Sequence, residues 1–222
     1  MGVGLWITVA AGVVALAASL AALVDAQAMK RREGGRRWPL AWLWSAIALY
    51  CACFVMMRVA HMASWPVLPW YYAQTVAGAG SAVSLFYILA GIVWGGPWTR
   101  IGAEFGGAGA LVTLTLLFAH GVEGPRVTPQ SIEYLPASEF ARAAIGIIYA
   151  VLPIVFAVLV AWVVRKDVSI RRRMAWFAPA LVLMYVPNAL RYVVFMEGTA
   201  SVVAAAAMAM GTVLGWRSYH TT

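Results

Sequence analysis

Two arginines and an asparagine are the residues most able to do chemistry, because they lie inside apolar segments. Asn188 and Arg191 belong to YVPNALRYVVFMEG, and Arg58 belongs to a second apolar segment. A guanidinium held away from water requires a carboxylate or several carbonyl oxygens as partners. Asn188 precedes Arg191 by about one helical turn, so the two share a helix face. These residues predict a polar pocket that binds a small anionic or amphipathic ligand.

Further polar side chains are predicted to lie at the same depth. Counted along their helices from Trp38 in the second segment and from basic residues in the others, three arginines and a histidine all lie roughly 30 Å away. We expect Arg191 to face the bundle interior and to pair with Glu139 or Glu197. Arginines would supply charge-assisted donors, and the amide and imidazoles would shape specificity. The predicted ligand-binding residues are Arg58, His61, His120, Glu139, Arg142, Asn188, Arg191 and Glu197.

The elements that must hold these residues are membrane helices. The chain is 64% hydrophobic and only 11% charged, far from the average of soluble proteins. About 20 apolar helical residues cross the ~30 Å hydrocarbon core of a bilayer. We therefore predict one all-α domain over residues 1–222, a seven-transmembrane-helix bundle. The predicted spans are 4–26, 38–60, 70–95, 102–120, 140–164, 174–195 and 199–216.

The charge distribution predicts the orientation. If the first basic loop, KRREGGRRW, is cytoplasmic, all but four of the 16 Lys and Arg residues lie inside. The N-terminus is then outside, the C-terminus is inside, and the acidic loop GVEGPRVTPQSIEYLPASE is outside. The net charge of +8 is mostly this orientation signal and not a nucleic-acid-binding surface. We expect an integral protein of a prokaryotic inner membrane, with the lipid bilayer as its surroundings.

Residue types exclude most seven-helix chemistries. Retinal requires a lysine near mid-membrane, but Lys30 and Lys166 both lie in loops. Three histidines are too few for a zinc hydrolase site, and no catalytic triad can be assembled. We therefore expect no enzyme activity, no metal and no cofactor. A heme- or quinone-binding subunit remains an alternative, with His61 and His120 as axial heme ligands.

A small-solute transporter is the other alternative. Spans 1–3 and 5–7 both start outside and both contain a basic loop between their first two helices, which resembles the three-one-three plan of the SWEET sugar carriers. The Pro-Gln motif of that family is missing from the relevant spans. In GAEFGGAGA, Gly102 and Gly106 form a small-residue face that predicts close packing against another helix.

Over nearly its whole length the chain resembles the seven-transmembrane N-terminal sensor region of some bacterial and archaeal histidine kinases. The resemblance rests on KRREGGRRWPLAWLWSAIALY, on RRRMAWFAPALVLMYVPNALRYV with its late asparagine, and on TASVVAAAAMAMGTVLGW. It implies a receptor-like function in signal transduction that passes a ligand signal to a cytoplasmic output. Only RSYHTT follows Trp216, so we expect either an isolated sensor portion or a stand-alone protein that signals through a cytoplasmic or membrane protein partner.

Overall fold

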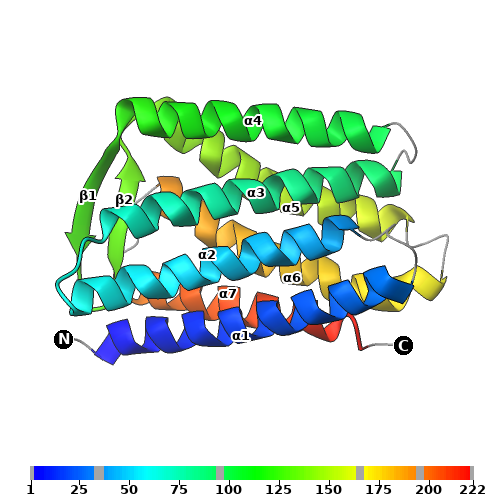
Figure 1. Cartoon of the computed structure of the whole chain (residues 1–222), viewed down its shortest axis with the longest axis horizontal. Coiled ribbons are helices and arrows are strands. Elements are labelled where there is room, and N and C mark those ends of the chain that lie inside the picture. Colours follow the sequence, from blue (N-terminus) through cyan, green and yellow to red (C-terminus); the bar gives the residue numbers. More distant parts are fainter. Residues whose placement is uncertain (1–2, 33–37, 94–97, 164–167, 194–197, 221–222) are drawn as a thin grey trace.

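The chain forms a helical bundle with a two-stranded β-hairpin at one end (Figure 1). The computed structural model describes residues 3–32, 38–93, 98–163, 168–193 and 198–220. Within these ranges the elements are α1 (Val3–Arg32), α2 (Trp38–Met62), α3 (Leu68–Val93), α4 (Trp98–His120), β1 (Val122–Val127), β2 (Ile132–Pro136), α5 (Glu139–Val163), α6 (Val168–Val193) and α7 (Thr199–Arg217).

Each of the seven predicted segments is helical over its described part. The bounds differ most at α1, which ends at Arg32 rather than at 26, and at α6, which begins at Val168 rather than at 174. In both helices the basic residues that flank the apolar segment continue the helix. Among the described residues, five helices, α1 to α4 and α7, are long and apolar enough to cross a membrane. The chain is therefore compatible with an integral membrane protein, while the count of seven spans and the orientation stay predictions.

Helices that are neighbours in sequence pack together, and α1 closes the bundle against α7. The exception is α4, which packs on α3 and only lightly on α5. A Cβ atom at Gly106 would lie 2.9 Å from the ring of Phe86, and one at Gly102 would lie 2.5 Å from Cβ of Ala90. The predicted small-residue contact is therefore confirmed, with α3 as the partner. Large apolar side chains such as Phe105 are exposed elsewhere on α4, as expected for a face against lipid.

The segment predicted to be an acidic loop forms a hairpin, so the all-α prediction is wrong in this detail. β1 and β2 pair antiparallel, with Val122 opposite Pro136 and Val127 opposite Ile132. Proline normally disfavours a strand, but Pro125 lies where the pairing is irregular, so it interrupts no regular ladder. β1 is mostly exposed, whereas every residue of β2 is buried against the bundle.

The hairpin is held more firmly at its root than at its tip. At the root, Nε of Arg142 on α5 donates to the carbonyl oxygen of Pro136 at 2.6 Å, and its Nη2 lies 2.7 Å from Oε1 of Glu123. At the tip, the Thr8 hydroxyl donates to the carbonyl oxygen of Gln130 at 3.4 Å, the long end of the hydrogen-bond range. The hairpin thus spans the bundle end from α5 to α1.

Candidate functional site

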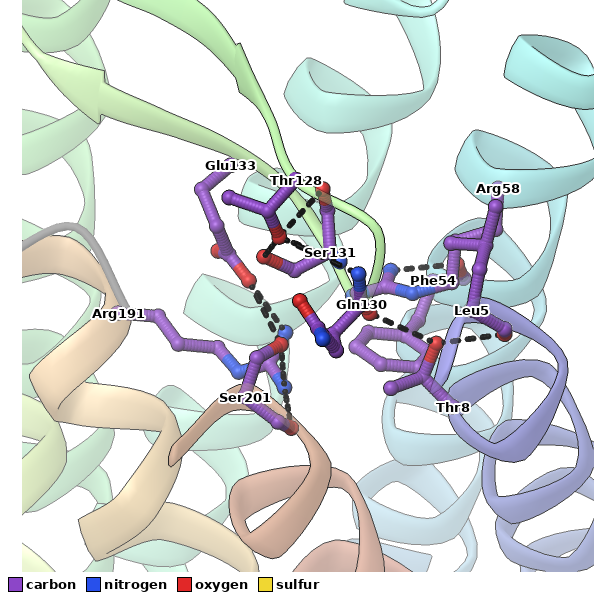
Figure 2. A network of polar contacts seen from close by, with 10 residues as sticks. All are labelled: Leu5, Thr8, Phe54, Arg58, Thr128, Gln130, Ser131, Glu133, Arg191 and Ser201. Atoms are coloured by element: carbon purple, nitrogen blue, oxygen red, sulfur yellow. Dashed lines mark hydrogen bonds and ion pairs between the residues drawn. The ribbon is translucent and has the colours of Figure 1, made fainter. Parts of the chain in front are cut away.

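Arg191 lies in the last turn of α6, and its guanidinium is buried at the hairpin end of the bundle (Figure 2). Nη1 donates to Oε1 of Glu133 at 3.2 Å, and both side chains are only 6% exposed. Nη2 donates to the carbonyl oxygen of Ser201 on α7 at 2.9 Å. The Ser201 hydroxyl donates to the same Glu133 oxygen at 3.1 Å. The prediction that Arg191 faces the interior is confirmed, and its contacts join α6, α7 and β2.

Arg58 lies on α2 at the same end and is fully buried. Its Nη1 donates to the carbonyl oxygen of Phe54 at 2.9 Å. Its Cζ lies 3.4 Å from the centroid of the Phe54 ring, and Cζ of Arg191 lies 5.0 Å from that centroid. Cation–π attraction stabilises a guanidinium at such distances but supplies no counter-charge. One phenylalanine ring therefore contacts two positive charges.

We call Arg58, Arg191, Phe54, Glu133 and Ser201 the arginine cluster. It contains two guanidiniums and one carboxylate, so positive charge is in excess. Nε and Nη2 of Arg58 and Nε of Arg191 are buried and have no hydrogen-bond partner among the described residues. A buried charge without full pairing costs several kcal/mol. The cluster therefore presents unused donors and a net charge that an anion would balance.

Two small cavities lie near the cluster, one at the hairpin end of the bundle and one toward its middle. The hairpin-side cavity, about 10 Å³, is lined in part by Arg191, Glu133 and Gln74. The mid-bundle cavity, about 30 Å³, is lined in part by Asn188. Tyr50 lines both. A water needs roughly 10–15 Å³ of such space, so the cavities have room for about one and about two waters.

Unused polar atoms face both cavities. Gln74 Oε1 and Arg191 Nε have no partner in the described part of the chain, so one water in the hairpin-side cavity would supply a donor and an acceptor. Asn188 Oδ1 is likewise unpaired, while its Nδ2 donates to the carbonyl oxygen of Met184 at 2.6 Å. Tyr134 of β2 also lines the hairpin-side cavity, and burial raises the pKa of its phenol, which keeps it neutral.

Two of the other predicted residues, Glu139 and Arg142, do not join the arginine cluster. Glu139 is exposed at the start of α5, and Glu197 lies outside the described residues. Among the described residues the carboxylate that pairs with Arg191 is Glu133, not the expected Glu139, and the expected pairing with Glu197 stays a prediction. Arg142 belongs to the hairpin root, because Glu123 and a backbone carbonyl take its donors.

The two candidate heme ligands have different surroundings. His61 is half-buried near the end of α2, whereas His120 is exposed at the end of α4. Axial ligation requires both imidazoles to face one enclosed gap between helices. This geometry gives the heme alternative no support.

Glu133 is the functional candidate that the sequence reasoning missed. In the sequence it lies within the segment that is predicted to be an acidic loop. The available signal was its setting in Ile132–Pro136, where β-branched and aromatic residues surround a single carboxylate. A carboxylate flanked by strand-forming apolar residues is typical of a buried partner for a cation. No known family model, curated protein or solved structure matches this chain.

Proposed function

We propose that the protein is a non-catalytic sensor or accessory subunit of a prokaryotic inner membrane. It binds a small anion at the arginine cluster and acts through a protein partner. The hairpin end of the bundle is the outer end in this proposal, so the ligand arrives from outside the cell. Charge asymmetry along the sequence supports that orientation.

The buried state of Arg58 is the observation that carries this proposal. Its guanidinium is fully buried, makes one hydrogen bond and has two nitrogens without partners among the described residues. The cluster carboxylate, Glu133, is already bonded to Arg191 and Ser201. Because desolvating an unpaired cation is costly, a protein retains one where a ligand uses it. An anion at Arg58 would accept its free donors and balance the excess charge.

Anion-dependent thermal stability of the protein in detergent tests the proposal. Wild-type protein should be stabilised by at least one of chloride, nitrate, formate and propionate, compared with neutral propionamide. Arg58→Met should abolish this stabilisation. Since it replaces an underpaired buried charge by an apolar side chain, it should not lower the Tm measured without anion.

Arg100→Met is the matched control, because Arg100 is 86% exposed at the other end of the bundle. It should keep the full anion response. An equal response in Arg58→Met, or no response in the wild type, would sink the proposal.

Transport is the second candidate. α4 packs on α3 and only lightly on α5, so it stands apart from the bundle that α1–α3 and α5–α7 form, as the single helix of a three-one-three plan would. In addition, Tyr50 lines both the hairpin-side cavity and the mid-bundle cavity. Flux separates the candidates, since a sensor binds its anion without accumulating it in proteoliposomes. Saturable, time-dependent uptake of the stabilising anion would favour the transporter.

A further inference from the structure

We propose that Glu133 is an internal ligand of the arginine cluster, and that a short monocarboxylate from outside displaces it and lifts the hairpin. This inference rests on the proposed anion site and names both its ligand class and its regulation. Its starting observation is that the cluster carboxylate comes from β2 and not from a bundle helix.

The contact between Glu133 and the cluster is incomplete. Arg191 Nη1 and the Ser201 hydroxyl both donate to the same oxygen, Oε1, at 3.2 and 3.1 Å. Charge-assisted hydrogen bonds from a guanidinium are usually about 2.7–2.9 Å, and the strongest are bidentate. A free carboxylate is not constrained by a strand, so it can use both oxygens against the unused donors. It can therefore compete with the tethered one.

The hairpin is attached in a way that permits this exchange. Arg142 fixes the root through two short contacts, at 2.6 and 2.7 Å. At the tip, the Thr8 hydroxyl lies 3.4 Å from the carbonyl oxygen of Gln130, and Gln130 packs against α1 at Gly4. Between root and tip, Glu133 supplies the ionic contact to the helices (Figure 2). Removing that contact leaves the middle of the hairpin held by the apolar packing of β2, with no ionic contact from the hairpin to Arg191.

The displaced side chain defines the ligand. Beyond Cα, glutamate is a two-carbon stem carrying a carboxylate, which is the chemical structure of propionate. A ligand of this kind fills the volume that the Glu133 side chain leaves. It also accepts the same two hydrogen bonds, from Arg191 and from Ser201. A bulkier acid meets the ring of Phe54 on α2, which is buried against both guanidiniums and does not move with the hairpin.

Cysteine labelling measures hairpin lifting directly. Ser131, in the hairpin turn, is fully buried, so the thiol of Ser131→Cys reacts with N-ethylmaleimide only when the turn opens. Val127→Cys is the matched control, because Val127 is already 50% exposed on the same hairpin. Native Cys51 and Cys53 are buried, and both are replaced by alanine in every variant. Propionate should accelerate labelling at residue 131 severalfold and leave residue 127 unchanged, and propionamide should do neither.

The affinity of the Glu133→Gln variant for propionate shows whether Glu133 competes with the ligand or helps to hold it. The apparent Kd of a partly blocked site is its intrinsic Kd divided by the fraction of time that the site is open. If Glu133 leaves the site open about one tenth of the time, removing it should tighten propionate binding by about tenfold. Glu139→Gln, which neutralises an exposed carboxylate, should bind like the wild type. Weaker binding by Glu133→Gln would show that Glu133 helps to hold the ligand and would overturn the inference.

The outcomes also distinguish this inference from the proposed function. Propionate binding without faster labelling at residue 131 overturns hairpin displacement and leaves the anion site standing. Absence of any anion binding removes both. If Glu133→Gln does not fold, the labelling comparison between propionate and propionamide in the Ser131→Cys protein still decides the question.

Discussion

The ion pair between Arg191 and Glu133 should be among the most sensitive points of the fold. Both side chains are 6% exposed, so solvent screens their charges little. Removing one partner of a buried pair typically costs about 3–5 kcal/mol, because the other charge stays buried without compensation. Arg191→Met leaves Glu133 with only the Ser201 hydroxyl, and Glu133→Gln leaves two guanidiniums without a carboxylate in the cluster. We expect each variant to lose about that amount.

The double variant Arg191→Met/Glu133→Gln separates the pair energy from general damage. Once both charges are removed, neither stays buried without its partner. The double variant should therefore lose much less unfolding free energy than the sum of the two single losses, with a coupling energy of about 3 kcal/mol. Thermal unfolding in detergent reports this as Tm. At about 2–4 °C per kcal/mol for a chain of this size, each single variant should fall by roughly 10 °C.

An exposed pair provides the comparison for this cycle. Arg100 and Glu104 lie 2.8 Å apart but are 86% and 62% exposed, so Arg100→Met should change stability by no more than about 0.5 kcal/mol. Additive costs in the Arg191 and Glu133 cycle, or a Tm of Arg191→Met equal to that of the wild type, would refute the reasoning. Arg191 would then be an anchor to lipid headgroups.

Three further predictions concern the fold, the membrane and the cofactor. Gly106→Ala should destabilise the protein by about 1–3 kcal/mol, because its methyl group meets Phe86, while Gly107→Ala, with open space around it, should be neutral or slightly stabilising in thermal unfolding. A reporter fused after Thr222 should be cytoplasmic, and Val127→Cys should react with an impermeant thiol reagent on intact cells; reaction only after permeabilisation would reverse the orientation. The absorbance spectrum of protein purified from its native membrane should lack a Soret band, and a Soret band that His61→Ala removes would establish the heme alternative.

The helices were predictable because their signal is local. Long apolar runs bounded by basic residues mark where a chain can cross hydrocarbon, and the structure places a helix on each of them. Arg58, Asn188 and Arg191 were predictable for a related reason. Burying a charged or polar group in an apolar segment is costly, so its presence there indicates an interior site. All three are buried in the bundle.

The hairpin and its contacts were not predictable from local patterns. Proline and glycine weaken the strand signal of β1, and the pairing of the two strands depends on register rather than on composition. Glu133 reaches Arg191 only because the hairpin folds over the bundle, across a sequence separation of 58 residues. The same placement gives Arg142 its partner Glu123 and buries Ser131 in the hairpin turn.

Equilibrium dialysis with radiolabelled propionate tests the central claim, an anion site built on Arg58, most directly. Wild-type protein should bind about one equivalent saturably, Arg100→Met should bind the same amount, and Arg58→Met should bind none above the background set by propionamide. Saturable binding that survives Arg58→Met, or its absence from the wild type, would contradict the account.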